Sequence, residues 1–204
     1  MGMMRTTLLL LSVSASTVVY GQTSKKYEKY LEKHNYQPGY IETIDGNRVA
    51  GLLKEYAGYR IYDKVVFVSE QGEKNTYYPY QLNAYGTDYE EYESNRANFL
   101  KVVNKANGIG LYQLEANSYP AAGSYGKAPT TSVTYFIKRS GEEGHVEVER
   151  SDFQRTFGGY FSDCSGLQSK IEERSFTHQH AEEMVEFYQY SCREQEAMNI
   201  NDRF

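Results

Sequence analysis

Apolar residues recur at helical spacing between residues 151 and 194, near the end of the chain. Ser151 and Gln154 have the pattern of a capping box, which predicts a helix start there. Leu167 and Ile171 mark a helical linker between two longer patterns. The first pattern comprises Phe153, Phe157, Tyr160, Phe161 and Cys164, and the second Ala181, Met184, Val185, Tyr188 and Cys192. We therefore expect two amphipathic helices, each with a cysteine at its C-terminal end.

Between residues 38 and 150 the pattern changes to short alternating or β-branched runs separated by turn residues. Tyr40–Ile44 and Arg48–Lys54 flank Asp45-Gly46, which is a strong signal for a β-hairpin. Further turns between extended runs are expected at Gln71-Gly72, Asn107-Gly108 and Ser140–Gly144.

Pro79 interrupts the run that starts at Lys74, so Tyr80–Gly86 is expected to form a helical turn or a loop. Tyr89 and Tyr92, with their acidic neighbours, are expected on an edge strand. The segment 119–130, rich in Gly, Ala and Pro, is expected to be a flexible loop.

Successive hairpins followed by helices predict an α+β fold. We expect an antiparallel β-meander of about seven or eight short strands, as an open sheet or a partly closed barrel, covered by two to three C-terminal helices. The predicted divisions are a signal peptide (1–21), a short N-terminal helix (22–37), the β-region (38–150), the C-terminal helical region (151–194) and a flexible tail (195–204).

The signal peptide is predicted from the basic start at Met1–Arg5, the apolar run Thr6–Val19 and the small Gly21 before Gln22. We therefore expect an exported protein that is periplasmic, extracellular or associated with the cell envelope, with no integral membrane segment after processing. Removing this segment takes away one arginine and no acid, and the net charge changes from −5 to −6. An acidic chain of this kind is not expected to bind nucleic acid.

The 204-residue chain contains two cysteines, Cys164 and Cys192. Export places them in an oxidising compartment, where a disulfide between them is expected. Two buried free thiols remain the alternative.

No catalytic or metal-binding pattern stands out. His178 and His180 are two residues apart and point away from each other on a helix, while His34 and His145 have no partners at ligand spacing. We expect no metal and no cofactor. Asp88, Glu90, Glu91 and Glu93 offer carboxylates for hydrolysis, but nothing in the sequence singles out a pair.

The chain has 21 tyrosines and no tryptophan. Tyrosine suits half-buried strand positions, and it also suits surfaces that stack on sugars or peptides. Packing is the expected role of most of them. The best candidates for ligand contact lie within residues 77–92, and they are Tyr78, Tyr80, Tyr85, Tyr89 and Tyr92.

The chain resembles a group of uncharacterised exported proteins of Bacteroidota. The resemblance implies export and an α+β fold, and it brings no activity with it. It rests on Gly39-Tyr40-Ile41, Asp45-Gly46, Tyr78-x-Pro-Tyr80, Tyr85-Gly86, Phe99-Leu100, Gly108, Leu111-Tyr112, Tyr135-Phe136, Phe157, Tyr160-Phe161, Asp163-Cys164, Tyr188 and Cys192.

Three functions follow as hypotheses. The first is a non-enzymatic structural or interaction module of the cell envelope, with an envelope protein or glycan as its partner. The second is a module that binds a glycan or peptide through residues 77–92. The third is an envelope hydrolase with a carboxylate pair.

Overall fold

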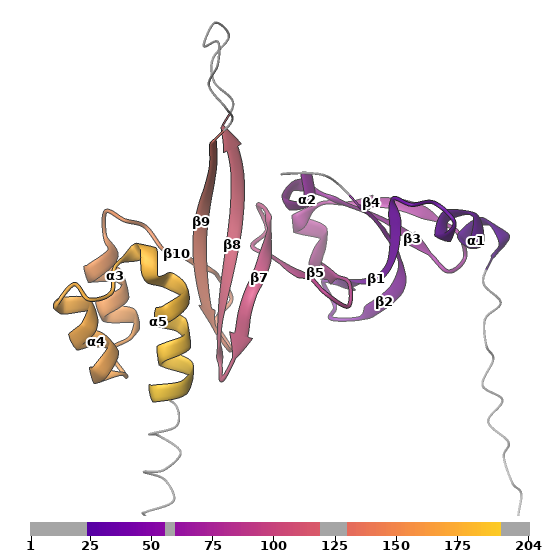
Figure 1. The fold of residues 1–204 in the computed structure, drawn as a ribbon. Helices are drawn as coiled ribbons and strands as arrows, with labels where there is room; N and C mark the ends of the chain where they lie inside the picture. The colour runs from indigo at the N-terminus through magenta and orange to yellow at the C-terminus, as the bar shows by residue number, and fades with distance from the viewer. Residues whose placement is uncertain (1–23, 56–59, 119–129, 193–204) are drawn as a thin grey trace, which may run out of the picture.

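The computed structural model describes residues 24–55, 60–118 and 130–192. Within them the chain forms an antiparallel sheet with helices at both ends of the molecule (Figure 1). The predicted α+β class is confirmed. Three predicted features lie outside the described residues, namely the signal peptide at 1–21, almost all of the loop at 119–130 and the tail at 195–204.

The described residues form a ten-stranded sheet in the order β10-β9-β8-β7-β6-β5-β1-β2-β3-β4. All neighbouring strands are antiparallel. β4 and β10 are the two edges, so the sheet is open, and the predicted strand number is too low. The strands are β1 (Tyr36–Thr43), β2 (Arg48–Lys54), β3 (Val65–Ser69), β4 (Lys74–Tyr77), β5 (Leu82–Gly86), β6 (Glu91–Ser94), β7 (Phe99–Ala106), β8 (Ile109–Ser118), β9 (Thr130–Arg139) and β10 (Val146–Glu147).

The hairpins predicted from turn residues are confirmed. Gly46, between β1 and β2, has a φ of 79°, which glycine adopts without strain. Asn107 and Gly108 join β7 to β8 with φ values of 48° and 83°. A type I′ turn needs two positive values of this kind, and Asn-Gly is a favoured pair for it.

The prediction of a helical turn or loop over Tyr80–Gly86 is wrong beyond Gln81. A 3₁₀ turn covers Pro79–Gln81, and β5 follows it at once and pairs with β1. β5 is stabilised by pairing with β1, a strand distant in sequence, and the residues next to β5 in the sequence do not indicate this partner. β6 also lies inside the sheet, between β5 and β7, and not at an edge.

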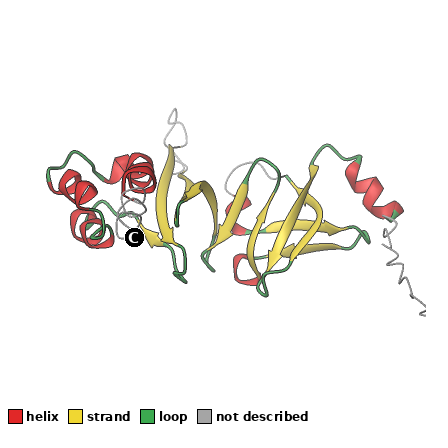
Figure 2. Ribbon diagram, turned by 90° about the horizontal axis from the view of Figure 1, so that it is seen from below, coloured by secondary structure: helices red, strands yellow, loops and turns green. Residues whose placement is uncertain are grey.

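The C-terminal helices α3 (Phe153–Tyr160), α4 (Ser165–Glu172) and α5 (Ala181–Phe187) pack against one face of β8 and β9 (Figures 1 and 2). Alternation along the strands directs Ile109, Leu111 and Ile137 toward these helices. Phe157, Phe161, Leu167 and Val185 on the helix side are fully buried. The predicted helical layer is therefore present, and it covers one end of the sheet.

The predicted helix ends need correction. The residue that caps α3 is Asp152, while the Ser151 hydroxyl donates to Glu149 and the Gln154 amide donates to the Ile171 carbonyl. The capping box is thus absent at this helix start. α3 ends at Tyr160, so Cys164 is not at its end and instead caps α4.

Cys164 and Cys192 form a disulfide with Cα atoms 5.5 Å apart. Cys192 ends the π-helical turn Tyr188–Cys192, which continues α5. In the same turn Gln189 is fully buried, donates to the Ile109 carbonyl at 3.2 Å and accepts from the Asn104 amide at 3.1 Å. The disulfide thus joins the C-terminal end of the helical layer to the start of α4, and Gln189 joins the same end to the sheet.

The N-terminal part of the sheet has a core of its own. The β-forming residues of Tyr62–Ser69 predict a strand, but α2 (Arg60–Asp63) occupies the start of this segment. The Tyr62 ring joins the cluster of Ile41, Leu53, Phe67, Leu82 and Phe99. α1 (Lys25–Leu31) is shorter than predicted and packs Tyr27 and Tyr30 against Tyr36, Leu52 and Val68. None of the described helices has the length and apolar character needed to cross a membrane.

Candidate functional site: a charged groove around Glu93

The face of β6–β9 opposite the helices carries a cluster of charged side chains on a small apolar base. Leu100, Tyr112 and Phe136 form this base, with exposed fractions of 0%, 1% and 8%. Glu93 on β6 lies above it, and the pairing Glu93↔Leu100 fixes its place.

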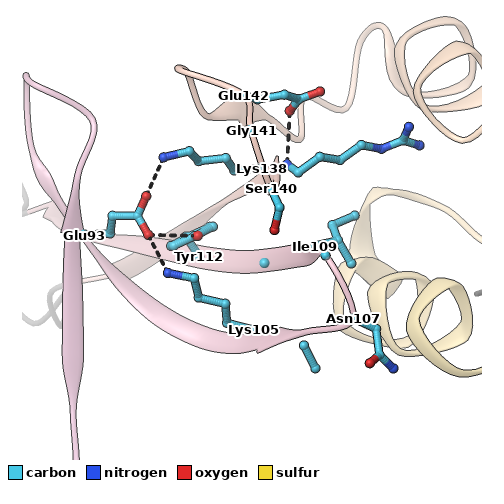
Figure 3. Close-up of a pocket in the computed structure, with 13 residues that line it drawn as sticks. Glu93, Lys105, Asn107, Ile109, Tyr112, Lys138, Ser140, Gly141 and Glu142 are labelled. Atoms are coloured by element: carbon cyan, nitrogen blue, oxygen red, sulfur yellow. Dashed lines mark hydrogen bonds and ion pairs between the residues drawn. The ribbon is translucent and has the colours of Figure 1, made fainter.

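Four groups surround the Glu93 carboxylate. Lys138 donates to Oε1 at 2.6 Å, while Lys105 at 3.2 Å and the Tyr112 hydroxyl at 3.0 Å donate to Oε2. Figure 3 shows the carboxylate between the two lysines and Tyr112. His145 Nε2 lies 3.5 Å from Oε1.

A β-bulge explains how Lys105 reaches this face. Val102 pairs with Tyr112, whereas Asn104 pairs with Leu111, so one extra residue, Val103, lies between them. The bulge turns Lys105 to the face of Tyr112 and Asn104 to the face of the helices, where Asn104 contacts Gln189. On the next strand, Lys138 pairs with Gly110 and therefore shares the face of Lys105.

Glu93 is ionised in this setting. Burial raises the pKa of its carboxyl group, but the hydrogen bond from Lys138, the charges of both lysines and the Tyr112 hydroxyl outweigh burial, and the pKa is lowered. Its side chain is 13% exposed. Glu93 thus acts as a fixed hydrogen-bond acceptor.

His145 is the most unusual side chain of the cluster. Its side chain is 1% exposed, and its ring packs edge-on against Tyr112 with centroids 4.5 Å apart. Neither ring nitrogen has a hydrogen-bond partner among the described residues. Burial lowers the pKa of His145 to about 4, Glu93 opposes the shift, and Lys138 and Lys105 add to it. The ring is neutral at pH 7.

Two cavities adjoin this cluster, and both are lined by Glu93, Lys105 and Lys138. The larger, about 500 Å³, extends from Arg48 at the start of β2 to His145 in the turn before β10. The smaller, about 350 Å³ and drawn in Figure 3, lies between the β7–β8 and β9–β10 turns. We call the two together the Glu93 groove. Because strands far apart in sheet order line it together, the curvature of the sheet shapes it.

The five tyrosines predicted to contact a ligand lie in three places. Tyr85 and Tyr92 stack at 4.7 Å in the N-terminal core and are 6% and 5% exposed. Tyr89, in the turn between β5 and β6, is 92% exposed. Tyr78 and Tyr80 are 43% and 63% exposed, with parallel rings 6.0 Å apart. The structure therefore brings together two of the five at the surface.

This exposed pair lies next to the groove. The Ser94 hydroxyl donates to the Pro79 carbonyl at 2.6 Å, and Ser94 itself lines the larger cavity. The Gln81 side chain accepts from the Tyr78 N–H at 2.9 Å and fixes the turn that carries both rings. The turn that carries Tyr78 and Tyr80 therefore lies beside the cavity wall at Ser94.

No family model, curated protein or solved structure matches this chain. Its function is therefore inferred from the geometry of the described residues. Among those residues, no group of three or more His, Cys, Asp or Glu side chains is placed to hold a metal ion.

Proposed function

We propose that the protein is an exported, non-enzymatic interaction module of the cell envelope that binds its partner in the Glu93 groove. The observation that carries this proposal is the polar cavity of about 500 Å³ on the face of the sheet that the helices leave uncovered. Its size is that of a small-ligand site. Five of its charged side chains are already held by hydrogen bonds to one another, which lowers the cost of ordering them on binding; they are Glu42, Arg48, Glu93, Lys105 and Lys138.

The state of Glu93 favours binding over hydrolysis. A glycosidase needs one carboxyl group whose pKa is raised, so that it can donate a proton. The pKa of Glu93 is lowered, as are those of Glu90, through its hydrogen bond from Lys101, and Asp163, where hydrogen bonds from Tyr188 and Arg139 outweigh burial. A hydrolase with a carboxylate pair remains the alternative hypothesis.

The Cys164–Cys192 disulfide supports export, because such bonds persist in oxidising compartments. We expect the protein recovered from the envelope fraction of its host to begin at Gln22, as N-terminal sequencing would show. Recovery of the chain from the cytoplasm with Met1 in place would contradict export.

Substitution at the rim of the groove tests the binding role. Arg48 lines the larger cavity, its side chain is 58% exposed and it donates to Glu42 at 2.9 Å. We expect Arg48→Ala to weaken ligand binding about tenfold, since one charge-assisted hydrogen bond is lost. The measurement is a binding isotherm for the best ligand from a panel of neutral oligosaccharides, acidic oligosaccharides and peptides.

Arg155→Ala is the matched control, because Arg155 also pairs with a carboxylate, is 81% exposed and lies on α3, away from the groove. It should bind like the wild type. The proposal is wrong if the wild type retains no member of the panel, or if both variants bind equally well.

A further inference from the structure

We propose that the Glu93 groove takes a neutral saccharide, with Tyr78 and Tyr80 as the aromatic platform beside it. This inference rests on the proposed function, because it names the ligand class of the same site. Three independent observations lead to it, namely the charge balance of the larger cavity, the unpartnered ring of His145 and the position of the tyrosine pair.

The larger cavity carries no net charge. Among the described residues that line it, four are cationic (Arg48, Arg96, Lys105 and Lys138) and four are carboxylates, while His145 is neutral at pH 7. An anion or a cation bound there would be attracted by four of these side chains and repelled by the other four. A hydroxyl group both donates and accepts, so it fits paired donors and acceptors. The cavity therefore favours a polyhydroxylated, uncharged ligand.

Fixed donor–acceptor pairs occur at both ends of this cavity. Arg48 Nε and Glu42 Oε2 are 2.9 Å apart, and Lys138 Nζ and Glu93 Oε1 are 2.6 Å apart. Each pair presents one donor and one acceptor side by side. Two neighbouring hydroxyl groups of a sugar ring can bind to such a pair, one accepting and the other donating.

His145 points to a ligand independently of the charges. Its side chain is 1% exposed, and neither nitrogen makes a hydrogen bond among the described residues, although Nε2 lies 3.5 Å from Glu93 Oε1. An unsatisfied buried polar group costs about 1–3 kcal/mol, so a native protein has a reason to keep one. His145 lines the cavity. A neutral imidazole offers one donor and one acceptor, again the complement of a hydroxyl group.

The tyrosine pair supplies an aromatic stacking surface, which the polar cavity lacks. The rings of Tyr78 and Tyr80 are parallel within 4° and exposed, and the turn that carries them is bound to Ser94 of the cavity wall. The carbon-bound hydrogens on one face of a sugar ring stack on aromatic rings, whose faces carry partial negative charge. A saccharide longer than the cavity would extend over this platform.

Substitution at Tyr80 tests the ligand class. On the oligosaccharide and peptide panel, we expect the processed wild type to retain neutral oligosaccharides. Tyr80→Ala should weaken that binding about tenfold, whereas Tyr80→Phe, which keeps the aromatic face, should bind within about twofold of the wild type. Because Tyr80 is 63% exposed, its substitution leaves the core intact, and thermal unfolding checks this.

Tyr89→Ala is the matched control. Tyr89 is 92% exposed and lies at the opposite end of β6 from Ser94, so its loss should leave binding unchanged. A different result would overturn the inference of a neutral saccharide and leave the proposed function standing. In that result the wild type binds only acidic oligosaccharides or peptides, Arg48→Ala loses this binding, and Tyr80→Ala keeps it. Retention of nothing would overturn both.

Discussion

Opening the Cys164–Cys192 disulfide is expected to lower the free energy of unfolding by about 3.6 kcal/mol. The two cysteines are 28 residues apart, and the bond restricts the unfolded chain over that loop. In the folded protein it joins the start of α4 to the π-helical turn after α5, so it links the middle of the helical layer to its C-terminal end. Urea unfolding of a Cys164→Ala/Cys192→Ala double variant measures the loss.

Wild-type protein unfolded in a reducing agent is the control, because reduction opens the bond without changing the size of either side chain. It should match the double variant. A change below about 1 kcal/mol in both experiments would show that packing of the buried helix residues alone holds this layer on β8 and β9. Two free thiols in the mature protein, detected by mass spectrometry, would refute the disulfide itself.

Acidification from pH 6.5 to pH 4 is expected to remove about 3 kcal/mol of stability through His145 alone. Burial lowers its pKa to about 4 in the folded protein, from 6.5 in the unfolded chain. Between these values the unfolded state binds a proton that the folded state does not. Stability therefore falls as the pH is lowered through this window, and the pH dependence due to His145 fades above pH 6.5, where the unfolded chain also loses this proton.

Glu93 acts in a lower window. Its pKa is lowered from 4.5, so the stability that its ionised form contributes is present above pH 4.5 and lost as the pH falls through its folded pKa. The two groups can thus be separated by pH. Lys138, Lys105 and Tyr112 face both of them.

His145→Phe tests the assignment, because it keeps an aromatic ring against Tyr112 and removes the titration. Stability measured by urea unfolding at several pH values should then be nearly constant from pH 6.5 to 4.5. The same substitution at exposed His34 should leave the wild-type profile. A profile in His145→Phe that falls as steeply as the wild type would contradict the account of this buried ring.

The sequence predicted best where the determining contacts are local. Asp45-Gly46 and Asn107-Gly108 specify their turns through backbone conformations that few other residues adopt, and the strands beside them follow. β5 was missed, since Pro79 reads as a break and its partner β1 lies about 40 residues earlier. The start of α3 was misplaced by a capping pattern whose side chains bind elsewhere.

The groove could not be predicted, because its side chains come from separate strands. Lys105 and Lys138 lie 12 and 45 residues from Glu93, and the strand register alone brings them together. The bulge at Val103 determines which face of the sheet Lys105 occupies, and no residue type in β7 predicts a bulge there. In the sequence, Glu93 is one of several carboxylates, and His145 is a histidine without partners at metal-ligand spacing.

The high tyrosine content suggests a ligand-contacting surface but does not identify which tyrosines form it. Tyr85 and Tyr92 carry hydroxyls that reach the Ile61 carbonyl and Glu90 while their rings fill the core. Tyr78 and Tyr80 belong to the same tyrosine-rich segment and are exposed. A tyrosine suits either place, so three-dimensional packing separates them.

The central claim is that the Glu93 groove is the ligand-binding surface. The most direct measurement is a two-dimensional ¹H–¹⁵N NMR titration of the processed protein with the oligosaccharide best retained on the panel. We predict that the amide signals of Ser94, Asn95, Gly144 and His145, which line the larger cavity, shift together and saturate. Saturating shifts confined to α3, α4 and α5, with these four signals unmoved, would contradict the account.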